Sequence, residues 1–484
     1  MKQIPTQRIG DKVLRRRRFS TRLRRILGVP ALFAAGYGDV GSSIYYALGV
    51  VALVALGATP IALLVAGIIY IFNALTYAEG SAMFPEAGGS ASFARHGFND
   101  LASLISGWAL MLSYIVTISI SAYTIPPYLS HFWPILKEPV IGTATSLGII
   151  LFLMLINVIG IRESSRMNIF FISIDIATQL TLIILGILLI LRPNPGVLFQ
   201  HMFGEGNWPP MQNLILGIAL AALCFTGVET VSQLAEETRQ PARRVPQAYV
   251  LMIVIVLVLF AGISIVALSA MTPQLLGDPV SGWARDPVAG IAANLPSAIL
   301  QSIFAPLVAV LAATILLTAT NAGLMGISRL ALNLAAHQEM PATLGRVHPQ
   351  FRTPYIAIIV FCLAALLVLT PGFFTTGFFA DLGALYVFGS LLCFALAHAS
   401  ILYLRAKKPD LSRPFRIGWN INIQGRELPI TAILGLVATV VVWVVVLAQQ
   451  PYARNVGFGW MVIGLIGYAL YRRRANLPII GKRE

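Results

Sequence analysis

Two carboxylates lie beside glycines in the middle of long apolar stretches. The first stretch reads Gly36-Tyr37-Gly38-Asp39-Val40-Gly41-Ser42-Ser43, and the second reads Thr226-Gly227-Val228-Glu229. Glycine weakens a helix by about 1 kcal/mol relative to alanine, and a charge at the centre of a bilayer costs at least about 2.5 kcal/mol. Glycines alone can simply let helices pack closely. Two glycine clusters that each contain an acid instead favour unwound backbone that lines a polar cavity.

The elements that must position these acids are membrane helices. The chain has 484 residues, of which 57% are hydrophobic and only 11% charged, and its mean hydropathy is +0.80. This composition is typical of integral membrane proteins. A span needs about 20 apolar residues, and we predict twelve spans at 30–55, 59–83, 100–127, 139–160, 169–191, 211–234, 247–271, 298–325, 354–371, 378–404, 428–448 and 455–471.

The basic residues predict the orientation of these spans. If the N-terminus is cytoplasmic, all but four of the 34 Lys and Arg residues lie in cytoplasmic segments; the four are Lys137, Arg192, Arg285 and Arg454. This bias follows the positive-inside rule. We therefore expect a multi-pass protein of a bacterial-type inner (plasma) membrane with both termini in the cytoplasm. The run Arg15–Arg18 is interpreted as an anchor to anionic lipid. It lacks the aromatic residues of a nucleic-acid site, so no nucleic-acid partner is expected.

Both acid-containing breaks fall at corresponding positions, in spans one and six. This spacing predicts two five-helix repeats of inverted topology with a binding site between the discontinuous helices. We therefore divide the chain into a basic N-terminal segment (1–29), a first repeat (30–191), a second repeat (192–404), a cytoplasmic loop (405–427), two further helices (428–471) and a short tail (472–484).

Several loop motifs resemble those of the amino acid–polyamine–organocation (APC) superfamily. They are Phe84-Pro85-Glu86-Ala87-Gly88-Gly89-Ser90, Leu234-Ala235-Glu236-Glu237-Thr238-Arg239-Gln240-Pro241 and Lys408-Pro409-Asp410 to Arg416. The resemblance implies an all-α membrane protein with the LeuT-type five-plus-five inverted repeat, broken helices one and six, twelve membrane helices, and alternating access.

The first span is also similar to potassium importers. Tyr37-Gly38-Asp39-Val40-Gly41-Ser42-Ser43-Ile44-Tyr45-Tyr46 resembles the first-helix signature of the KUP family, and the third and sixth spans resemble KimA-type proteins. This second resemblance implies a potassium site made of oxygens from Asp39, Tyr46, Thr117, Ser121, Thr226 and Glu229, next to broken-helix backbone at Gly38, Gly41, Ser42, Ser43 and Gly227. Oxygen atoms are the ligands that replace the water shell of potassium.

These observations predict a secondary active transporter, with potassium uptake by proton symport as the first hypothesis. The alternative is a proton-coupled amino acid or amine permease of the APC superfamily, because the two acids could also bind an ammonium group. Neighbouring acids repel, so one can take up a proton, and Glu229 and Asp175 are the candidate proton carriers. No nucleophile–base pair or metal-ligand cluster indicates an enzyme. We expect no cofactor beyond the transported ions, a lipid bilayer as surroundings, and an assembly compatible with a homodimer.

Overall fold

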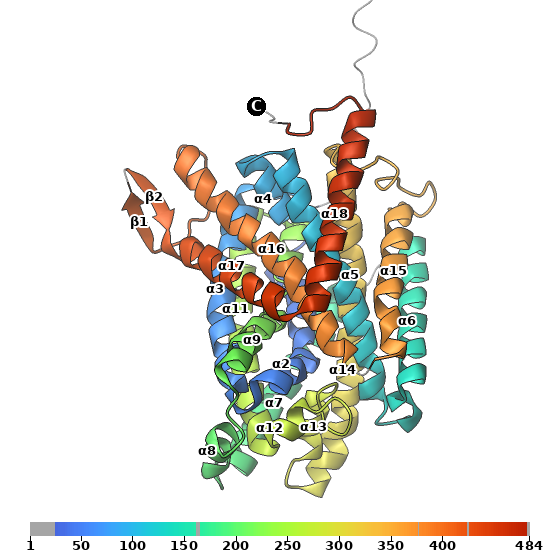
Figure 1. The fold of residues 1–484 in the computed structure, drawn as a ribbon, viewed down its shortest axis with the longest axis vertical. Helices are drawn as coiled ribbons and strands as arrows, with labels where there is room; N and C mark the ends of the chain where they lie inside the picture. The colour runs from blue at the N-terminus through green and yellow to red at the C-terminus, as the bar shows by residue number, and fades with distance from the viewer. Residues whose placement is uncertain (1–24, 161–164, 376, 424, 482–484) are drawn as a thin grey trace, which may run out of the picture.

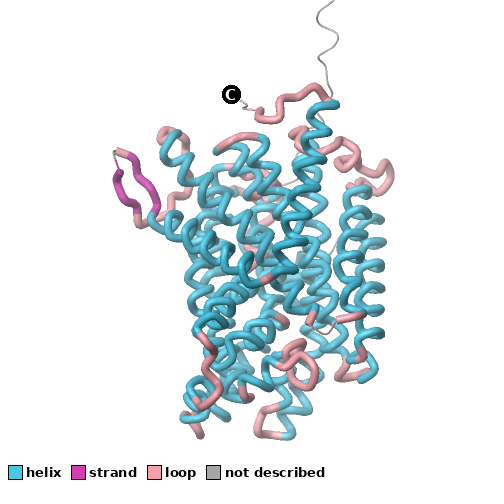
Figure 2. The backbone as a smooth tube through the Cα atoms, viewed as in Figure 1, coloured by secondary structure: helices cyan, strands magenta, loops and turns pink. Residues whose placement is uncertain are grey.

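The computed structural model describes residues 25–160, 165–375, 377–423 and 425–481, so the predicted anchor Arg15–Arg18 lies outside the described residues. The described chain is a bundle of long helices (Figures 1 and 2). Ten of its helical segments are long and apolar enough to cross a membrane. Of these, Ala47–Met83 covers the second half of predicted span one and all of span two. The twelfth predicted span is a continuous helix, α18 (Pro451–Arg474).

The first repeat comprises spans one to five. Its helices are α1 (Val29–Val40), the 3-10 turn η1 (Gly41–Tyr45), α2 (Ala47–Ala55), α3 (Thr59–Met83), α5 (Asp100–Leu129), α6 (Pro139–Ile159) and α7 (Ser165–Gly186). The second repeat comprises α9 (Met211–Ala221), the 3-10 turn η5 (Ala222–Phe225), α10 (Glu229–Gln233), α11 (Pro241–Ala270), α14 (Ala298–Ala336), α15 (Tyr355–Leu369) and α16 (Phe378–Lys407). The helix α17 (Ile430–Gln449) and α18 follow.

Corresponding helices of the two repeats pack on one another. α3 lies against α11 and α5 lies against α14, while α1 contacts α10 and α2 contacts α9. Packing of α3 on α11 and of α5 on α14, with the first half of each broken helix against the second half of the other, agrees with an inverted repeat about a pseudo-two-fold axis. The fold is therefore the LeuT-type arrangement, with helices one and six each divided into two halves.

Shorter elements cover the two ends of the bundle. At the end that we call the upper face lie α4 (Ser90–Gly97), the hairpin of β1 (Asn420–Ile423) and β2 (Arg426–Pro429), and the C-terminal residues (Figure 1). At the opposite end, the lower face, lie α8 (Gly196–Phe203), α12 (Pro273–Gly277) and α13 (Pro287–Ala293) (Figure 1).

The hairpin was not predicted from the sequence. Its two strands pair antiparallel from Asn420 with Pro429 to Ile423 with Arg426, and they are the strands of the described chain (Figure 2). The predicted loop 405–427 is thus partly ordered as a small sheet, because Gly425, at φ +77, closes a tight turn between two short extended segments.

Candidate substrate site

The first helix break lies further along the chain than the sequence predicted. Gly38 remains within α1, and regular helix ends at Val40. The 3-10 turn that follows stops at Tyr46, whose φ of −136° and ψ of −38° interrupt the helix. Gly41, in this turn, packs so closely on the ring of Tyr37 that a methyl group there would lie 2.7 Å from Cε1. Gly38 has its neighbours at ordinary contact distances, so its helical conformation is not disturbed.

The second break directly adjoins the first. The backbone of Thr226 is extended, Gly227 has a φ of +96°, and α10 begins at Glu229. A methyl group on Gly227 would lie 2.7 Å from Cγ of Asp39. The unwound backbone of span six therefore rests on the carboxylate of span one.

Asp39 and Glu229 are both buried, each with 1% of its surface exposed. Oδ2 of Asp39 accepts a hydrogen bond of 2.5 Å from the hydroxyl of Thr230. Within the described part of the chain, Oδ1 of Asp39 and Oε2 of Glu229 have no hydrogen-bond partner. Because buried polar atoms are nearly always paired, these two oxygens are suited to a donor that comes from outside the chain. The two acids are also close enough to interact electrostatically.

The hydroxyl groups of the predicted set point in several directions. The hydroxyl of Tyr46 lies 3.0 Å from Oγ of Ser43. Those of Thr117 and Thr226 donate to the backbone carbonyls of Ser113, at 3.0 Å, and Leu223, at 2.8 Å. Their lone pairs can still accept a hydrogen bond.

Two serines of the predicted set are buried as well. The Ser42 hydroxyl donates to the backbone carbonyl of Asp39 at 2.7 Å and so braces the turn after that residue. Ser121 lies one turn beyond Thr117 on α5, and its Oγ has no partner among the described residues.

Three residues of the site were missed in the sequence. Thr230 follows Glu229 directly, and its role could be suspected only from that adjacency. Tyr114, on α5, interacts electrostatically with both acids, and its hydroxyl adjoins that of Thr230. Tyr386, on α16, interacts with Asp39, Glu229 and Tyr46 and adjoins Thr117. No motif marks Tyr386, because only the packing of α16 on α5 brings it to the acids.

Asp175 belongs to a separate cluster. Its carboxylate, on α7, accepts hydrogen bonds from the hydroxyls of Tyr37, at 2.9 Å, and Tyr45. It also accepts one from Nε2 of Gln179 at 2.8 Å. Since Tyr37 lies in α1 and Tyr45 lies in η1, Asp175 ties α7 to the end of α1 and to the 3-10 turn that follows it. The sequence predicted a proton carrier here, and the structure adds a contact that fixes the shape of the broken helix.

Comparison with known proteins decides the family. Residues 27–471 match the family model described as amino acid permease. The chain is a member of the amino acid permease family. The match supports the resemblance to the APC superfamily that the loop motifs indicated, and this is a family of transporters and not of enzymes.

Several proteins similar to this permease are named as transporters of organic solutes. The branched-chain amino acid permease BcaP of Bacillus subtilis (strain 168) is 27% identical over 476 residues, covering 93% of this chain and 94% of its own. The methylthioribose transporter of the same organism is 27% identical over 492 residues, covering 95% of each chain. The glutamate/serine transporter AimA, also from that organism, is 24% identical and covers 95% of this chain and 84% of its own.

The resemblance to KUP and KimA-type potassium importers finds no support in these comparisons, which agree better with the alternative, an amino acid or amine permease. A few residues around Asp39 and Glu229 suggested it, whereas the match to the amino acid permease model extends from residue 27 to residue 471. Oxygen-rich side chains at a helix break suit an ammonium group as well as a metal cation, so these short motifs do not distinguish the two.

Proposed function

We propose that the protein is a proton-coupled secondary transporter of a small organic solute that carries an ammonium group, an amino acid or an amine. The observation that carries the proposal is the pair of unpaired carboxylate oxygens, Oδ1 of Asp39 and Oε2 of Glu229, buried where the two broken helices meet. An ammonium group has three N–H donors and a positive charge, and it satisfies both oxygens.

The packing of the site supports a solute that is enclosed during transport. Asp39 and Glu229 are shielded from both faces of the bundle, and Tyr46, Tyr114 and Tyr386 beside them are equally buried. Aromatic rings around a cation add favourable contact as well as hydrogen-bonding hydroxyls. Release then requires the helix halves to move, as in alternating access between inverted repeats.

Proton coupling is supported by the number of acids. Two ionised carboxylates at one buried site repel one another, and the bound ammonium group compensates that repulsion. A proton that binds Glu229 together with the solute removes what remains of it, and release of both on the same side couples the two fluxes in one direction. Asp175, held by Tyr37 and Tyr45 at the first break, is the second candidate proton carrier.

The test is uptake into proteoliposomes that contain the purified protein and a pH-sensitive dye. Labelled leucine, serine, glutamate, lysine, agmatine and putrescine are offered in turn, with rubidium as a tracer for potassium. We expect accumulation of at least one ammonium-bearing compound together with acidification of the lumen. Uptake of rubidium with none of the organic compounds would contradict the proposal. Asp39→Asn, which has the same size and lacks the charge, should lose the uptake of the ammonium-bearing compound.

A further inference from the structure

A series of buried polar side chains continues from Glu229 toward the upper face. Gln233 lies one turn beyond Glu229 on α10 and therefore on the same side of that helix. It is 1% exposed, and in the described chain neither its Nε2 nor its Oε1 has a hydrogen-bond partner. The hydroxyls of Ser81 and Ser90 are equally buried, and their hydrogen-bonding neighbours are the hydroxyl of Tyr249 for Ser81 and the hydroxyl of Tyr77 and the thiol of Cys393 for Ser90. A buried amide with neither end satisfied is rare in folded proteins.

These side chains lie close together. The loop between α3 and α4 passes directly over Gln233, since a methyl group on Gly89 would lie 3.3 Å from its Nε2 and 2.7 Å from Oγ of Ser232. The hydroxyl of Tyr77 adjoins Ser90 and, at 3.8 Å, Sγ of Cys393. The hydroxyl of Tyr249 adjoins Ser81 and Ser232. Tyr77, Cys393 and Tyr249 all interact electrostatically with Glu229.

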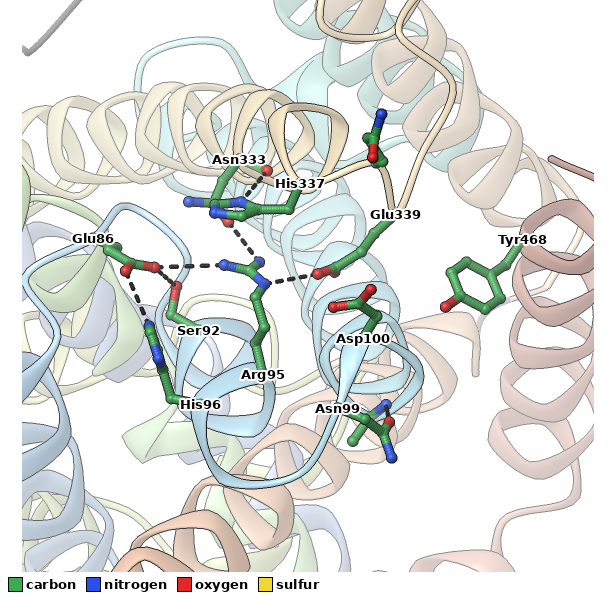
Figure 3. A network of polar contacts seen from close by, with 12 residues as sticks. Glu86, Ser92, Arg95, His96, Asn99, Asp100, Asn333, His337, Glu339 and Tyr468 are labelled. Carbon is green, nitrogen blue, oxygen red and sulfur yellow. Dashed lines mark hydrogen bonds and ion pairs between the residues drawn. The ribbon is translucent and has the colours of Figure 1, made fainter. Parts of the chain in front are cut away.

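The far end of the series meets an ionic network at the upper face (Figure 3). A methyl group on Gly88 would lie 3.0 Å from Oδ1 of Asn333, which accepts a hydrogen bond of 3.0 Å from Arg95. Glu86 accepts hydrogen bonds from Ser92 at 2.9 Å and from Arg95 at 3.4 Å. It also pairs with Nε2 of His96 at 3.1 Å (Figure 3). The side chains of Glu86 and His96 are 35% and 38% exposed, so this end reaches the surface.

We infer that Gln233, Ser81 and Ser90 hold a file of ordered water that connects Glu229 with Glu86 and His96, and that this file conducts the coupled proton to the upper face. We call these three residues the polar track. Water is the ligand that fits because both polar ends of Gln233 are unpaired in the described chain, and each serine hydroxyl can make more hydrogen bonds than its neighbours supply. Buried waters typically make about three hydrogen bonds to such atoms. The O–H bond of the Glu229 carboxyl breaks, its proton passes to the adjacent water, and a proton leaves at the other end.

The negative charge of Glu86, at the surface end of the polar track, favours movement of the proton toward the upper face. Burial by itself raises the pKa of Glu86. This pKa is nevertheless lowered to about 2 by hydrogen bonds from His96 and Ser92 and by the positive charges of His96 and Arg95. Glu86 thus stays ionised and attracts a proton that emerges from the track without retaining it. The inference rests on the proposed proton coupling at Glu229, and it adds the path by which that proton leaves.

X-ray radiolytic footprinting tests for the water without any solute, because side chains beside bound water are oxidised by radicals formed there. We expect Cys393 and Tyr77 to be labelled despite their burial, while Cys362, which is equally buried in apolar surroundings on α15, is not. Gln233→Leu should lower labelling of Cys393 to the level of Cys362, since it removes the ligands of a buried water. Equal labelling of Cys393 and Cys362 in the unaltered protein would overturn the inference.

Transport tests the conduction of the proton. With leucine, agmatine and putrescine as probes, Gln233→Leu should reduce solute-driven acidification by about 100-fold, the scale of a lost proton-transfer group. Exchange of labelled for unlabelled solute, which needs no net proton movement, should persist. Unchanged acidification would overturn the inference. If Gln233→Leu does not fold, acidification and solute exchange are measured in the double variant Ser81→Ala/Ser90→Ala, which should show the same loss. The control is Thr439→Val, which changes a buried hydroxyl on α17.

The outcomes also separate this inference from the proposed function. If the unaltered protein takes up none of the six organic compounds offered above, the proposed solute class is wrong and only the footprinting result bears on the track. If it takes up a probe without acidification, the transport proposal stands, but proton coupling and the conducting track are both refuted.

Discussion

The hydroxyl of Thr230 donates a 2.5 Å hydrogen bond to Oδ2 of Asp39, and so joins span six to span one at the level of both helix breaks. The bond satisfies one oxygen of the carboxylate and leaves the other, Oδ1, buried without a partner in the described chain. Thr230 therefore orients the acid that we propose as the ammonium ligand. Any change in the separation of the two broken helices also changes this bond.

Substitution of Asp39 should reduce transport more than substitution of Thr230. Asp39→Asn is expected to abolish uptake of the ammonium-bearing solute, because it removes a buried charge–charge contact worth several kcal/mol. Thr230→Val should reduce uptake by about tenfold, since loss of one hydrogen bond to a buried charged group costs about 1.5–3 kcal/mol. Initial rates of uptake in proteoliposomes measure both effects. A Thr230→Val rate equal to that of the control Thr439→Val would show that the bond is not needed.

Gly227 should not tolerate a side chain. Its φ of +96° is strained for an L-residue, and a methyl group would lie 2.7 Å from Cγ of Asp39. We expect Gly227→Ala to lower thermal stability in detergent and to abolish uptake. The matched control is Gly467→Ala in α18, where a methyl group meets no atom within 4 Å. In a helix that control change stabilises by about 1 kcal/mol. Similar melting temperatures for the two variants would contradict the prediction.

Local composition was enough to predict the two broken spans, because glycines and an acid rarely occur together in mid-membrane unless the backbone there is unwound around a polar cavity. The exact turn of the first break was not predictable, because it depends on how the ring of Tyr37 covers Gly41. Thr230 and Tyr386 were missed for a related reason. Which polar residue of a helix faces the site is decided by how that helix packs against the other repeat.

The choice of solute shows a second limit. The residues around Asp39 and Glu229 supply oxygens, which bind a metal cation or an ammonium group equally well, so short motifs favoured potassium. Similarity over residues 27–471 instead places the chain in the amino acid permease family. Asp175 was found as a polar residue in an apolar span, but its contacts with Tyr37 and Tyr45 required the three-dimensional arrangement.

The ion pair of Glu79 with Arg405 should be important for stability. It is buried on both sides and bidentate, with distances of 2.7 and 2.6 Å, and Glu79 also accepts from the backbone N–H of Ile417. Glu79→Gln should destabilise the protein by about 3–5 kcal/mol, because it leaves the arginine buried without its counter-charge. The control is Glu427→Gln, whose 3.3 Å pair with Arg416 is half exposed on both sides. Thermal unfolding in detergent measures both, and equal effects would refute the prediction.

Stability should depend on pH through Asp286, in the lower-face loop before α13. Burial raises its pKa from 3.8 to about 6, although the charges of Lys137 and Arg285 partly lower it. The folded state therefore binds more protons than the unfolded state between these values, and stability falls as pH rises from about 4 to about 6. The loss is about 2–3 kcal/mol at neutral pH.

Asp286→Asn should remove this pH dependence and raise the melting temperature at pH 7 but not at pH 4. The exposed Asp278 is the control, because its pKa is lowered by hydrogen bonds from Ser281 and from the backbone of Val280 and Ser281. Asp278→Asn should leave the Asp286 effect in place. A melting temperature of Asp286→Asn that follows the same pH curve as the unaltered protein would disprove the assignment.

The pair of Arg329 with Glu237 should hold the upper side of the site closed. Arg329 lies on α14, and its 2.8 Å contact reaches the segment just after α10. The backbone carbonyl of Glu237 in turn accepts hydrogen bonds from Ile26, at 2.9 Å, and Leu27, at 3.0 Å, at the start of α1. One ion pair therefore connects one half of each broken helix to the long helix α14. Its side chains are partly exposed, 27% and 18%, so it is worth about 0.2–1 kcal/mol.

Arg329→Ala should shift the population toward a state open at the upper face. The buried thiol of Cys224, in η5 beside the site, reports this opening in a Cys362→Ser/Cys393→Ser background. We expect its rate of labelling by N-ethylmaleimide to rise by about two- to fivefold, as the energy of a partly exposed pair allows. The charge exchange Arg329→Glu/Glu237→Arg should restore slow labelling, whereas either exchange alone should not. Arg346→Ala, an exposed change in the following loop, is the control, and labelling as slow in Arg329→Ala as in that control would show that the gate is held elsewhere.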